Sequence, residues 1–276
     1  MNDIVAFGEV LWDVIDGVPH IGGAPFNFAA HAVKCGLSAA IVSSVGDDEL
    51  GLRARKLVHD TYNVEDCYLI THPTLPTGTV KVTLENGIPS YEIVEPVAWD
   101  EIAFPEESSR PTRCRAFYFG SLAQRSPISD ATLKVLLETI EAEHIFFDVN
   151  LRQNYWSKEL IEADLAYADI LKVNDEEMKT LGFEAKALFA KYPRLKIVVE
   201  TRGADGCAVW TQEGKLFTSP AVADGPVVDT VGAGDSFSAA FLASLLNGAS
   251  VEEAARAGNI RAGKVAARAG AIPENL

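Results

Sequence analysis

Short apolar runs alternate along the chain with longer stretches in which apolar residues recur at the period of a helix. The runs that predict strands are 4–8, 39–45, 116–120, 144–149, 168–173 and 196–201. Helical periods cover 26–35, 49–59, 129–143, 157–167, 174–181, 233–246 and 251–269. This alternation is typical of parallel βαβ construction, and apolar runs without a polar face indicate strands buried on both sides. We therefore expect a mostly parallel central sheet covered by helices.

Residues 64–97 break this alternation. Three β-type segments, DCYLI, TGTVKVTL and SYEIVEP, follow one another there without a helix, and Asn86-Gly87 between the last two is a strong hairpin signal. We expect them to form a small β appendage, joined by residues 12–21, on a single α/β domain that spans 1–276. Such an appendage suits a lid or a dimer surface.

Composition excludes several classes of protein. The 276 residues carry a net charge of −15, and 48% of them are hydrophobic, as in a packed globular protein. A negative surface disfavours nucleic acid as a partner. There is no apolar stretch long enough to span a membrane and no secretory signal, so we expect a cytoplasmic protein. The four scattered cysteines favour reduced thiols over disulfides or a zinc site.

The segment DTVGAGDSF at 229–237 leads directly into a helical pattern. Small residues at Gly232, Ala233 and Gly234 let the backbone turn sharply and gather amide groups at a helix start, which favours an anion. Asp235 then lies where a general base would take a proton from an attacking hydroxyl. An ordinary glycine-rich turn, followed by an aspartate that is favourable in the first turn of a helix, would give the same sequence. The motif alone does not decide between the two interpretations.

Neither common nucleotide motif is present. No Lys-Ser/Thr pair follows these glycines, as it would in a Walker A loop, and the third glycine of the dinucleotide fingerprint is missing. A nicotinamide-dependent dehydrogenase would fit the alternating pattern but lacks its fingerprint.

Two polar segments suit a sugar. Gly22-Gly23 precede a helix that carries Asn27, and Asp13 lies upstream; Asp13 and Asn27 offer the acceptor and donor types that hold hydroxyl groups. Residues 148–152, which include Asn150 and Arg152, follow a buried strand, and ligands of open α/β sheets bind beyond such strand ends. A turn in the first segment and a salt bridge in the second remain alternatives.

Two more strand ends carry polar residues. Asn174 and Glu177 have the spacing of a capping box, while a water-mediated contact from Glu177 to Mg²⁺ is the functional alternative. Thr201, Gly203 and Gly206 form either a connecting turn or a loop against a nucleotide.

In this order the motifs resemble the ribokinase-like (PfkB) family of carbohydrate kinases over nearly the whole chain. The two signatures are GGAPFNFAAHAVKCG at 22–36 and DTVGAGDSFSAAFLASL at 229–245, and VGDDELG, NDEE and TRGADG fit as well. GGAP and FDVNLRQNYW are similar to the fructokinase branch, although Phe26 and Val149 depart from its usual pattern. The resemblance implies a three-layer α/β/α sandwich with a small β-sheet lid.

The resemblance also implies a role for each candidate residue. Asp235 would be the catalytic base, Gly232, Ala233 and Gly234 the anion hole, and Arg152 a bridge between sugar and phosphate. The sugar would contact Asp13, Gly23, Asn27 and Asn150, and ATP would contact Asn174, Thr201, Gly203, Gly206 and Asn259. Glu177 would face Mg²⁺ through water, and Asp229 with the 270–271 region would hold K⁺.

These expectations describe an ATP-dependent kinase that phosphorylates a primary hydroxyl of a small sugar, fructose first. Ribose, 2-keto-3-deoxygluconate or a nucleoside are alternative substrates. A non-catalytic sugar or nucleotide sensor is the alternative of another class. The lid would close over the sugar and pair two subunits into a homodimer.

Overall fold

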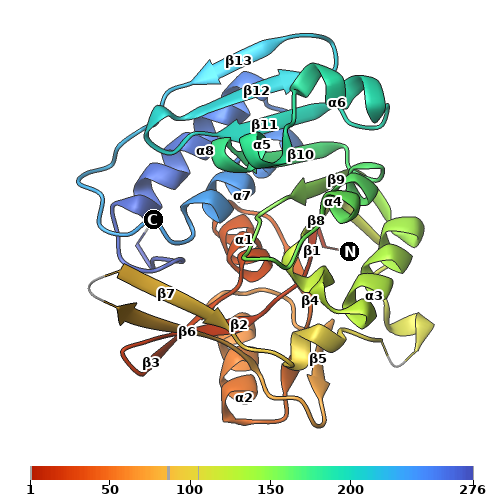
Figure 1. Cartoon of the computed structure of the whole chain (residues 1–276), viewed down its shortest axis with the longest axis vertical. Helices are drawn as coiled ribbons and strands as arrows, with labels where there is room; N and C mark the ends of the chain where they lie inside the picture. Colours follow the sequence, from red (N-terminus) through yellow and green to blue (C-terminus); the bar gives the residue numbers. More distant parts are fainter. Residues whose placement is uncertain (1, 86–87, 105, 276) are drawn as a thin grey trace.

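The computed structural model describes residues 2–85, 88–104 and 106–275 and places nine of the strands in one large sheet. Their order is β13-β12-β11-β10-β9-β8-β1-β4-β5 (Figure 1). They are β1 (Ile4–Phe7), β4 (Ala39–Gly46), β5 (Leu69–His72), β8 (Arg113–Gly120), β9 (Glu141–Asp148), β10 (Ile170–Asn174), β11 (Ile197–Thr201), β12 (Cys207–Thr211) and β13 (Leu216–Ser219). Neighbours from β5 to β11 run parallel, whereas β12 and β13 are antiparallel. The predicted mostly parallel sheet is confirmed.

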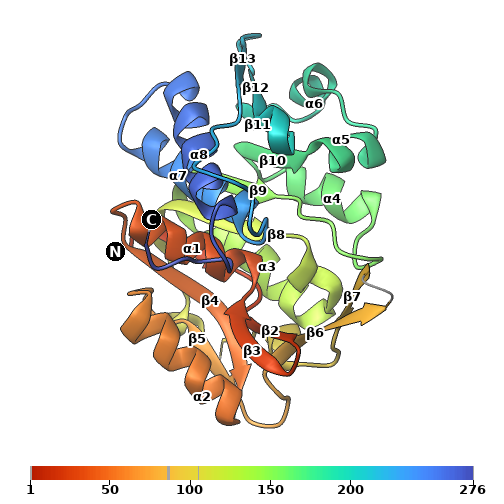
Figure 2. The same cartoon turned by 90° about the vertical axis from the view of Figure 1, so that its left-hand side faces the viewer.

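Helices cover both faces of this sheet (Figure 2). One layer holds α1 (Ala24–Lys34), α2 (Glu49–Lys56), α7 (Ala233–Leu246) and α8 (Val251–Ala266), and the other holds α3 (Pro127–Thr139), α4 (Lys158–Leu165), α5 (Asp175–Leu181) and α6 (Ala185–Lys191). Along β1, Ile4 and Ala6 belong to the first hydrophobic core, and Val5 and Phe7 to the second. This alternation gives the strand two apolar faces, so it needs a helix layer on each. The predicted three-layer sandwich is therefore confirmed.

Short helical turns complete the connections. They are a π-helical turn at Leu57–Thr61 and 3₁₀ turns at Ala98–Glu101, Glu107–Ser109, Leu122–Arg125 and Gly203–Asp205. Within the described ranges no helix is both long and apolar enough to cross a bilayer.

A second, four-stranded sheet has the order β3-β2-β6-β7. Its strands are β2 (Leu11–Ile15), β3 (Val18–Gly22), β6 (Gly78–Glu85) and β7 (Ile88–Ile93). β2 pairs parallel with β6, and the other two pairings are antiparallel. The predicted turn residues Asn86-Gly87 lie outside the described residues. Figure 1 shows this sheet set apart from the large one, as expected for the appendage.

The structure corrects one part of the predicted appendage. The last two residues of the segment DCYLI begin β5, which pairs with β4 in register Ser43–Leu69 and extends the large sheet. A short β run carries no information about which sheet edge it will join, because that depends on a partner far away in the sequence.

The helical period over 129–143 is also shorter than predicted. The helix α3 ends at Thr139, and β9 already begins at Glu141, opposite Arg113 of β8. The pairing with β8 extends the strand through residues whose apolar spacing also fits a helix, and tertiary pairing prevails over local pattern.

Candidate active site

The start of α7 forms a tight glycine turn. Gly232 caps the helix with φ 75°, and a Cβ atom added to it would lie 2.4 Å from the carbonyl oxygen of Ala271. Only glycine fits both the left-handed backbone and this close contact. The amide of Ala233 donates to the carbonyl of Thr230 at 3.2 Å. The N-terminal end of α7, which carries the positive end of the helix dipole, is therefore held closely against the backbone of Ala271.

Asp235 lies in this first turn and is held by a residue from the other end of the chain. Asn27 of α1 donates from Nδ2 to Asp235 Oδ2 at 2.9 Å. Burial raises the pKa of Asp235 to about 6, with a further increase from Asp148, while the Asn27 hydrogen bond, Lys172 and Arg152 lower it. A carboxyl group with this pKa is ionised at neutral pH and still accepts a proton readily, as a general base must.

The glycine loop before α1 is fitted around Glu9. A Cβ atom on Gly23 would lie 2.3 Å from the Glu9 carbonyl oxygen, and the amide of Ala24 donates to Glu9 Oε1 at 3.3 Å. Glu9 is buried, and desolvation raises its pKa to about 7, opposed in part by its backbone hydrogen bonds and by Arg152. Glu9 is not among the residues predicted from the sequence. Its only signal is an acidic residue directly after a buried strand.

Asp13 and Arg152 lie near this loop. Desolvation raises the pKa of Asp13, and the charges of His20 and Arg152 lower it. Arg152 is exposed and acts electrostatically on Glu9, Asp13 and Asp235, so its cation lies within reach of all three. Asn150 precedes it with a left-handed φ of 44°. The structure thus brings Asp13, Asn27, Arg152 and Asp235 into one region, while no hydrogen bond among the described residues joins Asn150 to them.

Asn174 and Glu177 form the predicted capping box of α5. The Asn174 side chain accepts from the Glu177 amide, and Glu177 Oε2 accepts from the Asn174 amide, both at 2.8 Å. The other carboxylate oxygen of Glu177 accepts from the amide of Leu151 at 2.8 Å. This carboxylate therefore also fixes the loop that carries Arg152.

Four residues predicted for the nucleotide, Thr201, Gly203, Gly206 and Asn259, gather at the ends of β11 and β13, whereas Asn174 ends the neighbouring strand β10. A Cβ atom on Gly206 would lie 2.1 Å from the carbonyl oxygen of Ser219, and Asn259 of α8 donates to that same carbonyl at 3.0 Å and to Pro220 at 3.2 Å. Thr201 ends β11, and Gly203 opens the turn after it with φ 52°. Asn259 is buried, and its hydrogen bonds hold the backbone at Ser219 and Pro220 in place.

Asp229 connects two backbone segments. Its Oδ1 accepts from the amide of Val231 and its Oδ2 from the amide of Gly270, each at 3.0 Å. The predicted cation region is thus assembled, with the carboxylate already hydrogen-bonded to backbone. In the described part of the chain, no three His, Cys, Asp or Glu side chains come together as a metal site.

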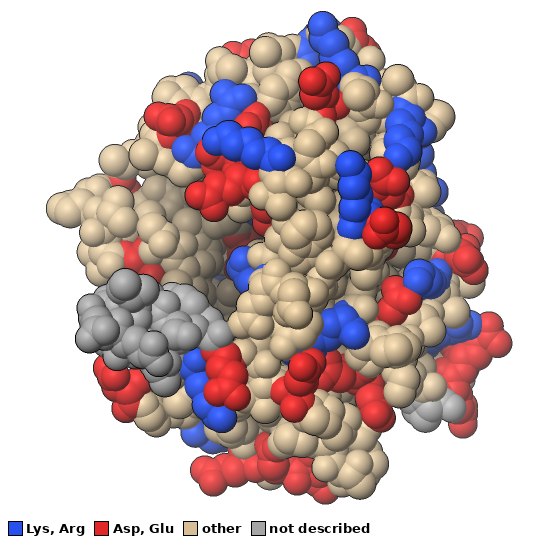
Figure 3. Space-filling view, in the orientation of Figure 1, with Lys and Arg blue, Asp and Glu red and all other residues tan. Residues whose placement is uncertain are grey.

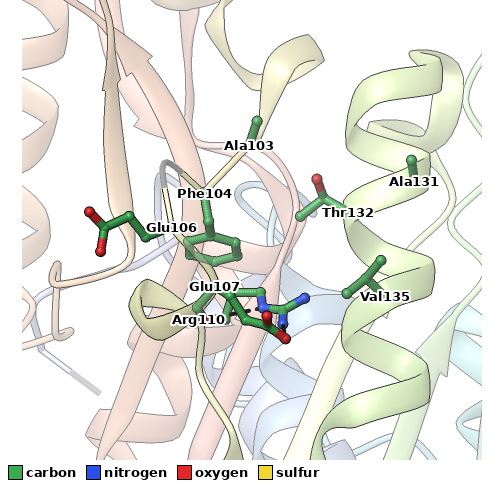
Figure 4. Close-up of a pocket in the computed structure, with 8 residues that line it drawn as sticks. All are labelled: Ala103, Phe104, Glu106, Glu107, Arg110, Ala131, Thr132 and Val135. Atoms are coloured by element: carbon green, nitrogen blue, oxygen red, sulfur yellow. Dashed lines mark hydrogen bonds and ion pairs between the residues drawn. The ribbon is translucent and has the colours of Figure 1, made fainter.

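The face drawn in Figure 3 has a hollow on its left-hand side that contains acidic and basic side chains. A different pocket, of about 380 Å³, lies between α3 and the segment before β8 (Figure 4). It is lined by Ala103, Phe104, Glu106, Glu107, Arg110, Ala131, Thr132 and Val135. It shares no residue with the polar site, and its one arginine is paired with Glu107.

A base of moderate pKa beside an anion-binding helix start suits a hydroxyl acceptor and a phosphate donor, and sugar-binding side-chain types lie next to it. The fold and site together define a small-molecule kinase. The chain belongs to the pfkB family of carbohydrate kinases, whose profile matches residues 1–275.

Individual relatives agree with this assignment. A fructokinase of Rhizobium leguminosarum bv. trifolii is 29% identical over 263 residues, which cover 88% of this chain and 79% of the relative. Fructokinase-2 of Zea mays is 28% identical over 272 residues, covering 88% and 80%.

Solved structures show the same fold. An uncharacterized sugar kinase of Pyrococcus horikoshii in complex with ATP superposes with a TM-score of 0.86 at 26% identity, covering 98% of this chain and 94% of that one. The apo fructokinase of Vibrio cholerae gives 0.83 at 25% identity, covering 96% and 98%. The predicted carbohydrate kinase of the fructokinase-like branch is confirmed.

Proposed function

We propose that the protein transfers the γ-phosphate of ATP to a primary hydroxyl group of fructose, with Asp235 as the general base. The observation that carries this proposal is the hydrogen bond between Asn27 and Asp235. It joins the glycine loop on the sugar side to the helix start on the phosphate side. A base held at that junction faces both the hydroxyl group and the phosphorus atom.

The chemical step follows from this placement. The hydroxyl oxygen bonds to the γ-phosphorus, the bond from that phosphorus to the bridging oxygen of ADP breaks, and the hydroxyl proton passes to Asp235. ADP leaves with the electron pair of the broken bond. Amide groups of Gly232 and Gly234, and the cation of Arg152, stabilise the charge on the transferred group.

ATP as the donor is supported by the Pyrococcus horikoshii structure, whose chain holds ATP. In this proposal ATP lies against Thr201, Gly203 and Gly206, on the wall held by Asn259. Glu177 would hold Mg²⁺ through water, and the ion would supply positive charge to the phosphates. K⁺ near Asp229 belongs to the same proposal.

Fructose is favoured by the names of the relatives, several of which are fructokinases. The departure at Phe26 does not argue against it. The Phe26 ring is fully buried and packs edge-to-face on Tyr62 at 5.4 Å, so it fills the core and does not narrow the site. Val149 is likewise buried.

The small sheet is proposed as the lid over the sugar and as the dimer surface. Ile15 and Val18 on it are 44% and 54% exposed, which a second subunit would cover. Light scattering on the protein and on an Ile15→Lys variant checks this, since a dimer that persists in the variant contradicts the assigned surface.

The test of the function is ADP release from ATP and Mg²⁺ with fructose, other hexoses, ribose, 2-keto-3-deoxygluconate and nucleosides. We expect turnover with fructose that falls at least ~100-fold in Asp235→Ala, while calorimetry shows that fructose still binds. Replacing K⁺ by Na⁺ should lower the rate.

Each other outcome removes a defined part of the proposal. Turnover only with another compound on the panel replaces fructose as the substrate. Full activity in Asp235→Ala removes the assigned base. Binding of sugar and ATP without turnover supports a sensor.

A further inference from the structure

A lysine ammonium group is buried directly behind the phosphate-side helix start. Lys172 of β10 is 6% exposed, and its Nζ donates to Asp148 Oδ1 at 2.9 Å. A Cβ atom added to Gly234 would lie 3.3 Å from this Nζ. The cation therefore lies beside Gly234, in the space that a larger side chain would enter, one residue before Asp235.

Its partner Asp148 is almost completely buried, with 1% exposure, and is held from three sides. Oδ2 accepts from the Tyr118 hydroxyl at 3.1 Å and from Ser238 Oγ at 3.2 Å. Ser238 in turn lies one helical turn after Gly234 and contacts its carbonyl at 3.1 Å. The pair thus joins β8, β9 and β10 to α7, so it keeps a fixed position relative to the phosphate-side turn.

A buried ion pair is a poor device for stability alone, because desolvation of both charges offsets their attraction. Hydrophobic side chains of similar volume would fill the same space at less cost. A buried pair at this place in the fold is better explained by the charge it provides to the neighbouring turn.

Several charged or titratable groups face Asp235. They are Glu9 after β1, Tyr118 of β8, Asp148 of β9, Arg152 after β9 and Lys172 of β10, and Asn27 of α1 donates a hydrogen bond. Burial lowers the pKa of Lys172, but Asp148 and Glu177 outweigh it and the pKa is raised overall. Lys172 is thus a permanent cation, and it and Asp148 act on Asp235 in opposite directions.

We propose that Lys172 and Asp148 act as a positioning pair that sets the charge state of Asp235 and places a fixed positive charge behind the phosphate-side turn. This role rests on the proposed function in that Asp235 is the base it serves. Neither side chain contacts the reacting atoms in this role. Lys172 favours the ionised carboxylate of Asp235, and Asp148 opposes this effect. The base is therefore ionised at neutral pH and can still accept a proton from a hydroxyl group.

The primary experiment is a carbon-NMR titration of the Asp235 carboxyl group, with its signal assigned by its absence in Asp235→Asn. In Lys172→Met the midpoint should rise, and in Asp148→Asn it should fall, each on the order of one pH unit. The double variant should return towards the wild type, and Lys172→Arg should stay close to it. This titration needs no substrate, so its result is independent of whether fructose is phosphorylated.

A matched control lies at the opposite ends of the strands. Lys196 pairs with the buried Asp169 at 3.2 Å, and Lys196→Met removes a lysine from that pair, away from the site. Its titration midpoint for Asp235 should equal that of the wild type. The pH profile of kcat/KM provides a second readout, in which the acidic limb should move with the NMR midpoint.

Shifts in the same direction for Lys172→Met and Asp148→Asn, or no shift in either, would overturn the proposal. If Asp148→Asn does not fold, the comparison of Lys172→Met with Lys172→Arg decides it: equal midpoints refute the role of charge. An active Asp235→Asn variant would refute the proposed base and leave the measured shifts intact, so the two failures are distinguishable.

Discussion

The carboxyl group of Asp235 loses much of its water on folding and faces other acidic groups. Its pKa of about 6 in the folded protein lies above the ordinary 3.8, mainly through burial. The folded state therefore binds this proton more tightly than the unfolded state. The contribution to stability is most favourable below about pH 4, and it is lost as the pH rises through 6.

Asp235→Asn should therefore stabilise the protein while it abolishes catalysis. The amide keeps an oxygen for the Asn27 hydrogen bond and carries no charge. We expect the free energy of unfolding in urea at pH 8 to rise by about 1–2 kcal/mol, with little gain at pH 4. An equal gain at both pH values would contradict the electrostatic explanation.

Substitution of Gly232 and of Gly248 by alanine would strain the backbone similarly, so the two variants separate this strain from the effect of a steric clash. Both have left-handed φ values, 75° and 86°, but only Gly232 has a neighbour where a Cβ would lie. Gly248→Ala should cost about 1–2 kcal/mol of stability and leave activity unchanged. Gly232→Ala should cost more and lower kcat, because Ala271 must move away from the anion-binding turn. Thermal unfolding and steady-state kinetics measure both effects; equal results in the two variants would remove the role of Ala271.

Two helices begin with the same capping box, and this gives a control at the scale of the element. Glu253 of α8 caps Ser250, and Glu177 of α5 caps Asn174 and also accepts from the Leu151 amide. Glu253→Ala should cost about 1 kcal/mol or less and leave kcat/KM unchanged. Glu177→Ala should cost about 1–3 kcal/mol and lower kcat/KM, because the loop of Arg152 loses its anchor. Kinetic parameters that change equally in both variants would contradict this reading.

Most helices and strands could be predicted, since strands that are apolar on both faces and helices with capping residues carry local sequence signals. Two elements could not be predicted in this way. β5 has the same local pattern as the strands of the small sheet, and only its pairing with β4 assigns it to the large sheet. The short helix Ala185–Lys191 was not predicted, because seven residues offer barely two turns of periodicity.

The parts of the site that lie at glycine turns and helix starts could be predicted from the sequence. Residues whose role depends on burial within or beside a strand could not. In the sequence, Lys172 is a single polar residue between apolar neighbours in a buried strand, and its partner Asp148 lies 24 residues away. Glu9 likewise depends on burial that no local pattern gives. Proton affinities arise from the assembled surroundings, and these exist only in three dimensions.

At the scale of the whole molecule, Arg125 joins three regions. It is 3% exposed on its side chain, bonds both oxygens of Asp100 at 2.7 and 2.9 Å, and donates to the carbonyl of Val94, directly after strand β7 of the small sheet. Its guanidinium group also lies over the rings of Trp99 and Tyr155. The end of the small sheet, the segment at Trp99 and Asp100, and the loop after Arg152 thus all contact one side chain.

Arg125→Ala should therefore destabilise the protein by about 3–5 kcal/mol, because Asp100 is left buried without its cation. Lys134→Ala, which removes an exposed pair with Asp130 within α3, should cost less than about 0.5 kcal/mol. Urea unfolding measures both. A small effect at Arg125 would mean that water replaces the guanidinium group.

The bond between Asn27 and Asp235 spans 208 positions of the chain. At the usual speed of a ribosome, roughly 10–40 s separate the synthesis of its two ends. Through that interval the growing polypeptide carries the glycine loop before α1 but neither Asp235 nor the start of α7. With Asp235 as the proposed base, a half-made molecule has no means of consuming ATP, and activity begins only once translation has passed the α7 segment and the two ends have met.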